Sequence, residues 1–364
     1  IFGGKSSEYG VSLHSAGSLL RQIDDAKYTI IMIGITKEGD WYLYEGDIDA
    51  LEHDHWQQAG CTPCVLTRQG LLVLKENSYT TIELDCVFPV LHGKNGEDGT
   101  IQGLLEIMDI PYVGCGHLSS AICMDKEMTH IICEHAGVPC APYRCIYESD
   151  PRSMEEIFEE ASHALGLPLF IKPCNAGSSY GVHRVDTFDE FLEGMKDAFY
   201  HDGKGKVILE QTIEGFEIGC AVMGNRELTV GSVDEIEIKG SFFDYEGKYE
   251  MKDAAIYCPA RIDETLFEQA RTMAAKAYRA MNCRGMTRVD MFVTKDNRIV
   301  FNELNTIPGF TATSRYPSMM QAVGIEFPQL IDRLIALAME KYTEGEIIVL
   351  MRKSRAWAEI DLSR

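Results

Sequence analysis

Short apolar runs alternate with helical stripes of apolar residues along this chain of 364 residues. Runs rich in β-branched and aromatic residues predict strands, and apolar residues that recur every three or four positions predict helices. The predicted strands cover 30–35, 87–91, 169–171, 207–209 and 289–293, and the predicted helices cover 153–165, 187–200, 263–282 and 326–341. The alternation indicates an α/β protein in three parts, at 1–120, 121–215 and 216–345, with a tail at 346–364.

A hairpin is predicted where two strand-like segments flank a short polar connection. TRVDMFV at 287–293 and IVFNELN at 299–305 are joined through Asp296 and Asn297, and both of these residues tolerate a left-handed backbone. We therefore centre the turn between them. The resulting cross-strand pairs are Asp290 with Glu303 and Arg288 with Asn305.

The paired residues give this hairpin one polar face. Side chains opposite each other on two strands lie about 5 Å apart, so two facing carboxylates repel unless a cation lies between them. Carboxylate and amide oxygens at this spacing suit Mg²⁺. The alternative is a solvent-exposed sheet face on which Arg288 neutralises its neighbours. Strict alternation also assigns Phe292 and Phe301 to this polar face.

Composition and charge exclude several classes of partner. The chain is 45% hydrophobic and 25% charged, as expected for a globular protein, and it has no apolar run near the ~20 residues of a membrane span. The net charge is −22, so nucleic acid and anionic membranes are repelled by most of the surface. An anionic small ligand therefore needs a pocket with its own cations or metals.

Twelve cysteines are spread singly along the chain, mostly inside apolar runs. This distribution favours buried, reduced thiols in a cytosolic protein over a secreted disulfide scaffold. Cys61 and Cys64 form a CxxC pair, for which a redox role or half of a zinc site is the alternative. No second CxxC follows at the spacing of a zinc ribbon, which weakens the zinc interpretation.

A candidate phosphate-binding loop follows the predicted strand at 169–171. The segment PLFIKPCNAGSSYGV carries Lys172 at the strand end and then a small, flexible loop with Ser178 and Ser179. Successive backbone amides in such a loop can point at phosphate oxygens, and the lysine adds a positive charge. A Walker A motif is absent from the sequence. One strand later, Glu210 and Glu217 are either ordinary strand-end acids or acceptors for a nucleotide base and ribose.

Several ordered motifs resemble the D-alanine–D-alanine ligase family of the ATP-grasp superfamily, over 1–342. The motifs are FGGKSSEYGVS, LHGKNGEDGTIQG, MDK, FIKPCNAGSS, EGFEIG, FFDYEGKY, RVDMF and NELNTIPGFTATSRYP. The resemblance implies a Rossmann-like parallel-sheet domain at the N-terminus and two α+β subdomains that clasp ATP. It also implies that ATP phosphorylates a first D-alanine, that the amine of a second D-amino acid attacks the acyl phosphate, and that the dipeptide supplies peptidoglycan precursors. The resemblance further implies that the protein is a homodimer.

The resemblance assigns roles to the hairpin residues. Asp290, Glu303 and Asn305 match the family's Mg²⁺ ligands, for two ions with Mn²⁺ as an alternative. Arg288 matches the residue that stabilises oxyanion charge together with the backbone amide of Gly309, which we expect to lie in a strained glycine turn.

Further roles on the ATP side also rest on the resemblance. Lys126 and Lys172 match lysines that bind the phosphates of ATP, the loop of Ser178 and Ser179 covers these phosphates, and Glu210 and Glu217 match acids that bind adenosine.

On the amino-acid side, Glu8 matches the acid that holds the ammonium of the first D-alanine, and His92 matches a neighbouring histidine. Without the resemblance, Glu8 is an acid at a helix start and His92 is a turn histidine. Lys248 and Tyr249 match a loop that closes over the reacting phosphate and excludes water, although Tyr249 alone is equally a packed aromatic.

Two positions depart from the commonest family pattern. Ala176 precedes the GSS segment, where many members carry Glu, and Arg315 follows Ser314, where many carry Leu. This combination resembles the vancomycin-resistance branch, and retention of Lys248 and Tyr249 resembles the enzymes that make D-alanyl-D-serine. We therefore expect Ser314 and Arg315 to contact an amino acid as second substrate, D-serine or D-alanine.

The tail carries a separate resemblance. RKSRAWAEIDLSR at 352–364 is similar to the opening of PLP-dependent alanine racemases. The hypothesis is that the natural protein continues into a racemase or has one as a neighbour. A chance amphipathic tail is the alternative.

Two other classes of protein share part of this pattern. An ATP-grasp carboxylate–amine ligase with other substrates needs the metal and phosphate residues but not Glu8, His92 and Tyr249 together. A non-catalytic nucleotide-binding regulator is expected to lose a metal ligand or Arg288. Because all of these residues are present, both classes are less favoured than a D-alanine ligase.

Overall fold

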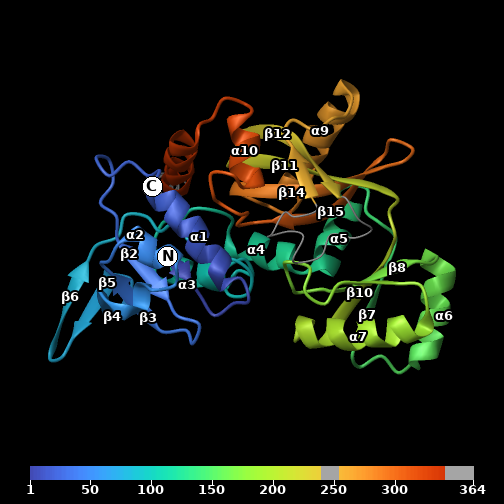
Figure 1. Cartoon of the computed structure of the whole chain (residues 1–364), viewed down its shortest axis with the longest axis horizontal. Coiled ribbons are helices and arrows are strands. Elements are labelled where there is room, and N and C mark those ends of the chain that lie inside the picture. Colours follow the sequence, from blue (N-terminus) through green and yellow to red (C-terminus); the bar gives the residue numbers. More distant parts are fainter. Residues whose placement is uncertain (239–253, 341–364) are drawn as a thin grey trace, which may run out of the picture.

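The computed structural model describes residues 1–238 and 254–340, and three β-sheets organise this part of the chain (Figure 1). The first and second sheets lie at opposite ends of the molecule, with the third sheet between them. Their strand orders are β1-β2-β3-β4-β5-β6, β7-β10-β8-β9 and β13-β12-β11-β14-β15. The strands are β1 (Phe2–Gly3), β2 (Met32–Ile35), β3 (Trp41–Tyr44), β4 (Cys61–Thr67), β5 (Gly70–Lys75), β6 (Ser78–Ile82), β7 (Tyr143–Tyr147), β8 (Leu169–Pro173), β9 (His183–Val185), β10 (Lys206–Gln211), β11 (Gly215–Gly224), β12 (Leu228–Ile238), β13 (Ala254–Tyr257), β14 (Gly285–Thr294) and β15 (Ile299–Asn305).

The four helices predicted from sequence are all present, within a few residues at each end. Two of them, α6 and α7, begin with complete capping boxes, Ser153 with Glu156 and Thr187 with Glu190, which satisfy backbone amides at the helix start. The helices are α1 (Tyr9–Leu20), α2 (Ile48–Glu52), α3 (Thr100–Ile107), α4 (His117–Met124), α5 (Lys126–His135), α6 (Met154–Leu165), α7 (Phe188–Asp202), α9 (Glu264–Ala280), α10 (Arg315–Gln321), a further helix at 327–340 and a 3₁₀ helix η1 (Trp56–Gln58).

The first sheet combines a parallel part with an antiparallel extension. Strands β1 and β2 are parallel, and parallel bridges join Phe2 to Val90 and Val87 to Tyr112. The strand predicted at 87–91 appears only as these two bridges, because Pro89 between them has no N–H to continue the ladder. Strands β3 to β6 then add antiparallel neighbours that the sequence pattern did not reveal.

The cysteine prediction agrees with the structure. All twelve cysteines are free thiols. Cys61 and Cys64 lie on one strand, β4, and Cys64 is buried in the core of the first sheet. The CxxC motif is therefore part of a strand, and a strand does not provide the exposed turn of a redox site.

The third sheet has a core face and a site face. Helix α9 covers the core face, and the apolar residues of α4 and α5 pack into the same core. Cys115, Cys123 and Cys133 belong to this core. The backbone of Cys140 forms a parallel β-bridge with Phe301 of β15. We therefore propose that residues 115–140 belong with the third sheet. The boundary predicted at 120 then moves, and the division into three parts is kept.

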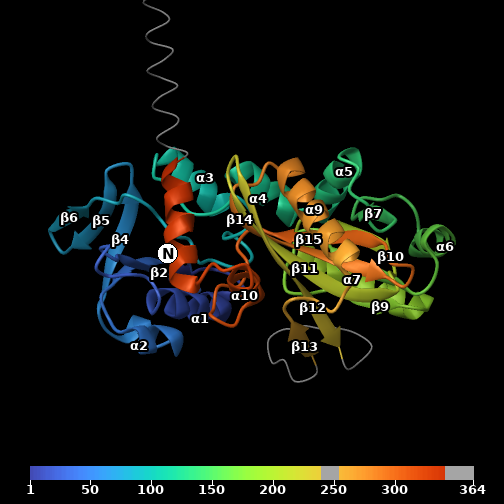
Figure 2. The same cartoon turned by 90° about the horizontal axis from the view of Figure 1, so that it is seen from above.

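Residues after β15 return to the N-terminal part of the chain. Tyr316 and Met319 of α10, with Leu330 and Leu334 of the last described helix, share one buried core with Leu13 of α1. Figure 2 shows α10 and the last helix beside α1. The segment between β15 and α10 is thereby fixed between the first and third sheets, and this segment contains Gly309 and Ser314.

Candidate active site

The hairpin of β14 and β15 forms the centre of the site, with the predicted register. Arg288 lies opposite Asn305, and Asp290 lies opposite Glu303. Asp290 is only 1% exposed and accepts hydrogen bonds from Arg288 Nε at 2.8 Å and from Asn305 Nδ2 at 2.8 Å. The predicted polar face is thus confirmed at these four positions. It lines a pocket, so the alternative of a solvent-exposed sheet face does not hold.

A β-bulge changes the rest of the hairpin. The register shifts between Asp290 and Met291, so that Met291 pairs with Phe301 and Asn302 is the extra residue. The shift reverses the alternation of side chains, since a one-residue slip moves a strand's side chains to the other face. The prediction that Phe301 shares the polar face was therefore wrong: Phe301 is buried in the core, and Asn302 contacts the site through Lys172.

Arg288 keeps its charge in this buried setting. Burial opposes a charged guanidinium, but Asp290 beside it outweighs this effect and raises the pKa of Arg288. Two parallel bonds, from Nε and Nη2, hold the guanidinium against the carboxylate at 2.8 and 2.7 Å. Arg288 is therefore a fixed positive charge at the base of the pocket.

Arg315 is held by three carboxylates. Its Nε and Nη2 both donate to Asp234 at 2.8 Å, and its Nη1 donates to Glu217 at 2.9 Å and lies 3.3 Å from Asp290. The guanidinium stands over Gly219, where any side chain would overlap it. Arg315 lines the pocket as predicted, but it also fixes the positions of the acids around it.

The two lysines predicted to bind phosphate come from β8 of the second sheet and from the start of α5. Lys172 Nζ lies 2.5 Å from Glu210 Oε2 and donates to Asn302 Oδ1 at 3.2 Å. Glu210 is buried, which alone would raise its pKa, but the charges of Lys172 and His130 hold the pKa well below its usual range. Lys126 Nζ donates to the backbone oxygen of Ala176 at 2.8 Å and lies 3.9 Å from Glu303 Oε2.

The two acids predicted for adenosine occupy different places. Glu210 lies on the second sheet beside Lys172, whereas Glu217 lies on the third sheet beside Arg315 and lines the pocket. The two sheets meet where Lys172 of β8 donates to Asn302 of β15.

The glycine-rich loop follows β8 and reaches the start of α1. Ser178 and Ser179 both have left-handed backbones, with φ of 50° and 57°. The hydroxyl of Ser178 donates to Glu8. Glu8 occupies the cap position of α1, yet its side chain caps no backbone amide of that helix. Its carboxylate therefore faces the loop, which supports a binding role over a helix-capping one.

Gly309 lines the pocket, and buried His92 lies behind this part of its wall, in contact with Ile307. His92 Nδ1 contacts the backbone oxygen of Ile307 at 3.0 Å, and Nε2 contacts Ser15 Oγ at 3.1 Å. Gly309 has no left-handed backbone, so the expectation of a strained turn was wrong. A Cβ there would instead lie 3.2 Å from Ser314 Oγ, so glycine allows a close approach.

These side chains converge on one cavity of about 440 Å³. Nine predicted residues line it, from the start of α1, the glycine-rich loop, the third sheet, the segment before α10 and the first residue of α10. They are Glu8, Ser178, Glu217, Arg288, Glu303, Asn305, Gly309, Ser314 and Arg315. Lys248 and Tyr249, like the tail at 352–364, lie outside the described residues.

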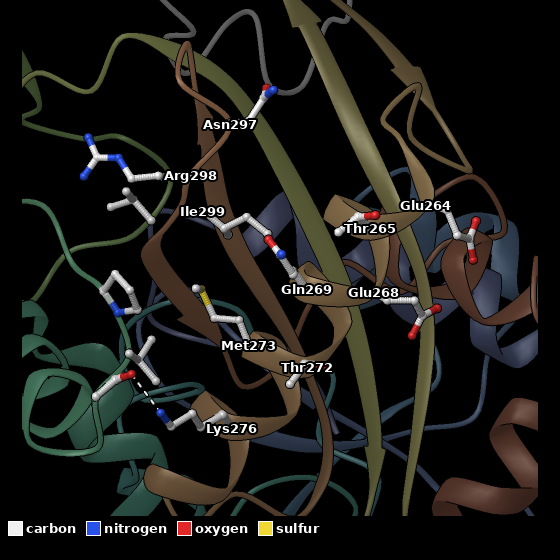
Figure 3. Close-up of a pocket in the computed structure, with 14 residues that line it drawn as sticks. Glu264, Thr265, Glu268, Gln269, Thr272, Met273, Lys276, Asn297, Arg298 and Ile299 are labelled. Carbon is white, nitrogen blue, oxygen red and sulfur yellow. Dashed lines mark hydrogen bonds between the residues drawn. The ribbon is translucent and has the colours of Figure 1, made fainter.

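A larger cavity, of about 880 Å³, lies on the α9 side of the third sheet (Figure 3). Its walls come from α9, the turn after β14 and the loop at 137–139, and Figure 3 shows Met273 and Ile299 between the charged ends of Glu268, Lys276 and Arg298. None of the predicted site residues lines it. The smaller cavity is therefore the candidate active site.

Sequence reasoning missed four side chains of the site. Asp234, His130 and Asn302 contact Arg315, Glu210 and Lys172, respectively, and Glu97 lines the cavity close to Glu8. Glu97 has a signal in the sequence, since it follows His92 in HGKNGEDG. Asp234, His130 and Asn302 become visible only when distant segments are brought together.

The comparisons with known proteins agree with this architecture. Residues 1–115 match the family model for the D-ala D-ala ligase N-terminus, and 132–336 match the model for the D-ala D-ala ligase C-terminus. The crystal structure of the VanG D-Ala:D-Ser ligase from Enterococcus faecalis is similar, with a TM-score of 0.84 and 46% identity over 93% of this chain and 97% of that chain. The fold is therefore that of an ATP-grasp ligase.

Curated relatives lead to the same family. A D-alanine–D-alanine ligase of Caldicellulosiruptor bescii is 43% identical over 96% of both chains. A vancomycin C-type resistance protein of Enterococcus gallinarum is 41% identical over 93% of this chain and 97% of the relative. The chain belongs to the D-alanine–D-alanine ligase family. None of the described helices is long and apolar enough to span a bilayer.

Buried His92 predicts a loss of stability in acid. Burial lowers the pKa of His92 to about 4, although its contact with Ile307 opposes the shift. The unfolded chain takes up this proton near pH 6.5, so stability is complete above that pH and falls by roughly 2 to 3 kcal/mol towards pH 4. Urea unfolding at pH 7.5 and 4.5 should show a smaller loss for His92→Gln than for wild type. His163→Gln, on the exposed face of α6, is the control, and parallel losses in all three proteins would contradict the prediction.

Proposed function

We propose that this protein uses ATP to join D-alanine to a second D-amino acid through D-alanyl phosphate, with D-serine as the preferred second substrate. The observation that carries the proposal is the contact between Ser178 and Glu8. This contact supports the proposal, because phosphoryl transfer to an amino-acid carboxylate requires a loop that binds phosphate to lie beside a group that holds the amino-acid ammonium, and these are the roles proposed for Ser178 and Glu8.

The phosphates of ATP are bound by Lys126, Lys172 and the loop of Ser178 and Ser179. Both lysines come from backbone that is fixed by hydrogen bonds: Lys126 N–H donates to Cys174 O at 3.0 Å, and Lys172 lies in strand β8. Glu210 and Glu217 are proposed to receive the base and ribose. The lysines neutralise phosphate charge where the overall field of the protein would repel it.

Asp290, Glu303 and Asn305 are proposed to hold Mg²⁺, two ions in the complete site, with Mn²⁺ as a substitute. The donors suit this ion, since they are hard oxygens from paired positions of one hairpin. Such a set leaves coordination positions for phosphate oxygens. When bound, the metal neutralises phosphate charge and orients the transferred group.

The amino-acid side then carries out the bond formation. Glu8 holds the ammonium of the first D-alanine, and Arg288 with the amide of Gly309 stabilises the oxyanion that forms when the second amine attacks. His92 fixes the backbone of Ile307 two residues before Gly309. Lys248 and Tyr249 are proposed to close over the acyl phosphate and protect it from water.

The preference for D-serine rests on the polar wall around Arg315. Arg315 lines the cavity and is held beside Gly219 by Asp234, which is itself fully buried. The guanidinium is therefore the polar group offered to a second substrate, and D-alanine would offer it only a methyl group. A hydroxyl of D-serine can replace a water hydrogen bond at such a wall. The similar VanG structure is that of a D-Ala:D-Ser ligase, which supports the same choice.

The proposed setting is the cytoplasm, where ATP is available and the twelve free thiols stay reduced. The dipeptide would supply peptidoglycan precursors. The protein is also proposed to act as a homodimer through α3 and α4. These adjacent helices expose Ile107 and Leu118 at 77% and 53% (Figure 2).

Charge supports a second copy as the partner of this face. A chain of net charge −22 repels its own copies, so a contact between copies needs a face with few charges. Within α3 and α4 the one acidic residue is Glu106, which is already bound by Tyr112 Oη and His117 Nδ1, both at 2.7 Å.

The principal experiment measures ADP formation with ATP and Mg²⁺. D-alanine with D-serine should give the mixed dipeptide, identified by mass, and removal of Mg²⁺ by EDTA should abolish it. Lys126→Met should lower kcat/KM for ATP at least tenfold, whereas Lys37→Met, an exposed lysine paired with Asp54, should not. ATP binding without turnover would indicate a regulator, and turnover only with other carboxylates would indicate a different ATP-grasp ligase.

Specificity is tested by removing Asp234 and Arg315 together. Arg315→Leu alone would leave three acids without their cation, which typically costs several kcal/mol, so we combine it with Asp234→Asn. The ratio of kcat/KM for D-serine to that for D-alanine should fall roughly 5- to 150-fold, corresponding to about 1 to 3 kcal/mol. An unchanged ratio in a folded double variant would place specificity elsewhere.

The dimer is tested by light scattering after size-exclusion chromatography. Wild type should elute as a dimer. Ile107→Glu should elute as a monomer, because each of the two copies would place one negative charge in the contact. Tyr200→Glu, at an exposed aromatic of α7, is the control and should remain dimeric. A monomeric wild type, or a dimer that persists in Ile107→Glu, would exclude this face.

A further inference from the structure

The turn after Asn305 is held almost entirely by the N-terminal part of the chain. Phe310 N–H donates to Ser15 Oγ at 3.4 Å, and Ala312 N–H donates to Ser18 Oγ at 3.0 Å, both from α1. His92 contacts the backbone oxygen of Ile307 at 3.0 Å. The position of this turn relative to the hairpin therefore depends on groups far away in sequence.

Glu97 provides the remaining connection, and it uses both carboxylate oxygens. Oε2 accepts the N–H of Gly93 at 2.8 Å, and Oε1 accepts the N–H of Ile307 at 3.3 Å. The backbone oxygen of Glu97 also accepts the hydroxyl of Thr306 at 3.4 Å. One side chain thus ties the loop that carries His92 to the turn that carries Gly309.

The geometry explains why this position needs a carboxylate. Two backbone N–H groups from different segments require two acceptors, and a glutamine offers one acceptor and a donor that would face an N–H. A buried N–H left without a partner costs about 1 to 3 kcal/mol, so the turn would move to recover a bond. Ile307 is two residues from Asn305 and two from Gly309, and misplacement by about 1 Å at a reacting centre can cost ~100-fold in rate.

We infer that Glu97 is a positioning residue for ligation: its carboxylate fixes the turn at 306–309 so that the Gly309 amide and the Asn305 side chain keep their places relative to Arg288. This role rests on the proposed function. Glu97 acts through the backbone of this turn and need not touch substrate.

The surroundings of Glu97 offer a competing role that experiment can separate. Burial and the nearby charge of Glu8 raise the pKa of Glu97, while the two N–H groups and Arg288 favour its carboxylate form. If Glu97 were instead a second acid for the ammonium of the first substrate, its removal would raise KM for D-alanine. A positioning residue changes kcat and leaves KM nearly constant.

The test compares Glu97→Gln with a matched neighbour, Asp98→Asn. Asp98 also accepts two backbone N–H groups, from Asn95 at 2.9 Å and Thr100 at 3.1 Å, but both lie within its own segment. Glu97→Gln should lower kcat roughly 10- to 100-fold with KM for ATP and D-alanine within threefold, and Asp98→Asn should keep kcat within threefold. A wild-type kcat in Glu97→Gln, or a loss seen only in KM for D-alanine, would overturn the inference.

A second measurement does not require activity. Amide hydrogen exchange should become faster at 306–310 in Glu97→Gln and remain unchanged there in Asp98→Asn. Unchanged exchange in Glu97→Gln would overturn the inference even if ligation is confirmed. If exchange is faster in Glu97→Gln but the wild-type protein has no ligase activity, the proposed function is refuted, and the conclusion that Glu97 fixes the turn still stands.

Discussion

The carboxylate of Asp290 holds three elements together. It accepts bonds from Arg288 on its own strand and Asn305 on the next, and it lies 3.3 Å from Arg315 of α10. A carboxylate that is 1% exposed would be very unfavourable without such partners, and loss of one partner of a buried pair typically costs about 3 to 5 kcal/mol. The hairpin, the start of α10 and the pocket floor therefore depend on one network of charges.

Two groups of ionic contacts join strands of the site. Arg315 joins Asp290 to Glu217 and Asp234, while Lys172 joins Glu210 to Asn302 of the bulged strand. Each cation bridges carboxyl or amide oxygens from different strands. In a chain of strong negative charge, these few buried cations locally reverse the field that an anionic substrate meets.

Local sequence was sufficient where the controlling contacts are local. The helices followed from their apolar stripes. Asp290 lies opposite Glu303 as predicted, but the predicted turn was one residue off, because Val293 pairs with Ile299, and the bulge restores the predicted register at the site. The bulge at Asn302 was not predictable, because burial of Phe301 in the core decides it. The partners of Arg315 were equally hidden, since Asp234 lies 81 positions away in the sequence. The antiparallel strands β3 to β6 were not predicted, because they are short and only part of each is buried, as in β6, where residues 78–81 are exposed.

The bulge also separates the two ends of the hairpin. On the site side, Asp290 is fixed by its partner Gly219 on β11 as well as by Glu303. On the far side, the exposed turn at 295–298 follows a register of its own. A change in that turn therefore need not pass along the ladder to Asp290 and Glu303. The hairpin has an exposed tip and a base fixed within the sheet, and Asn302, the extra residue of the bulge, is the boundary between them.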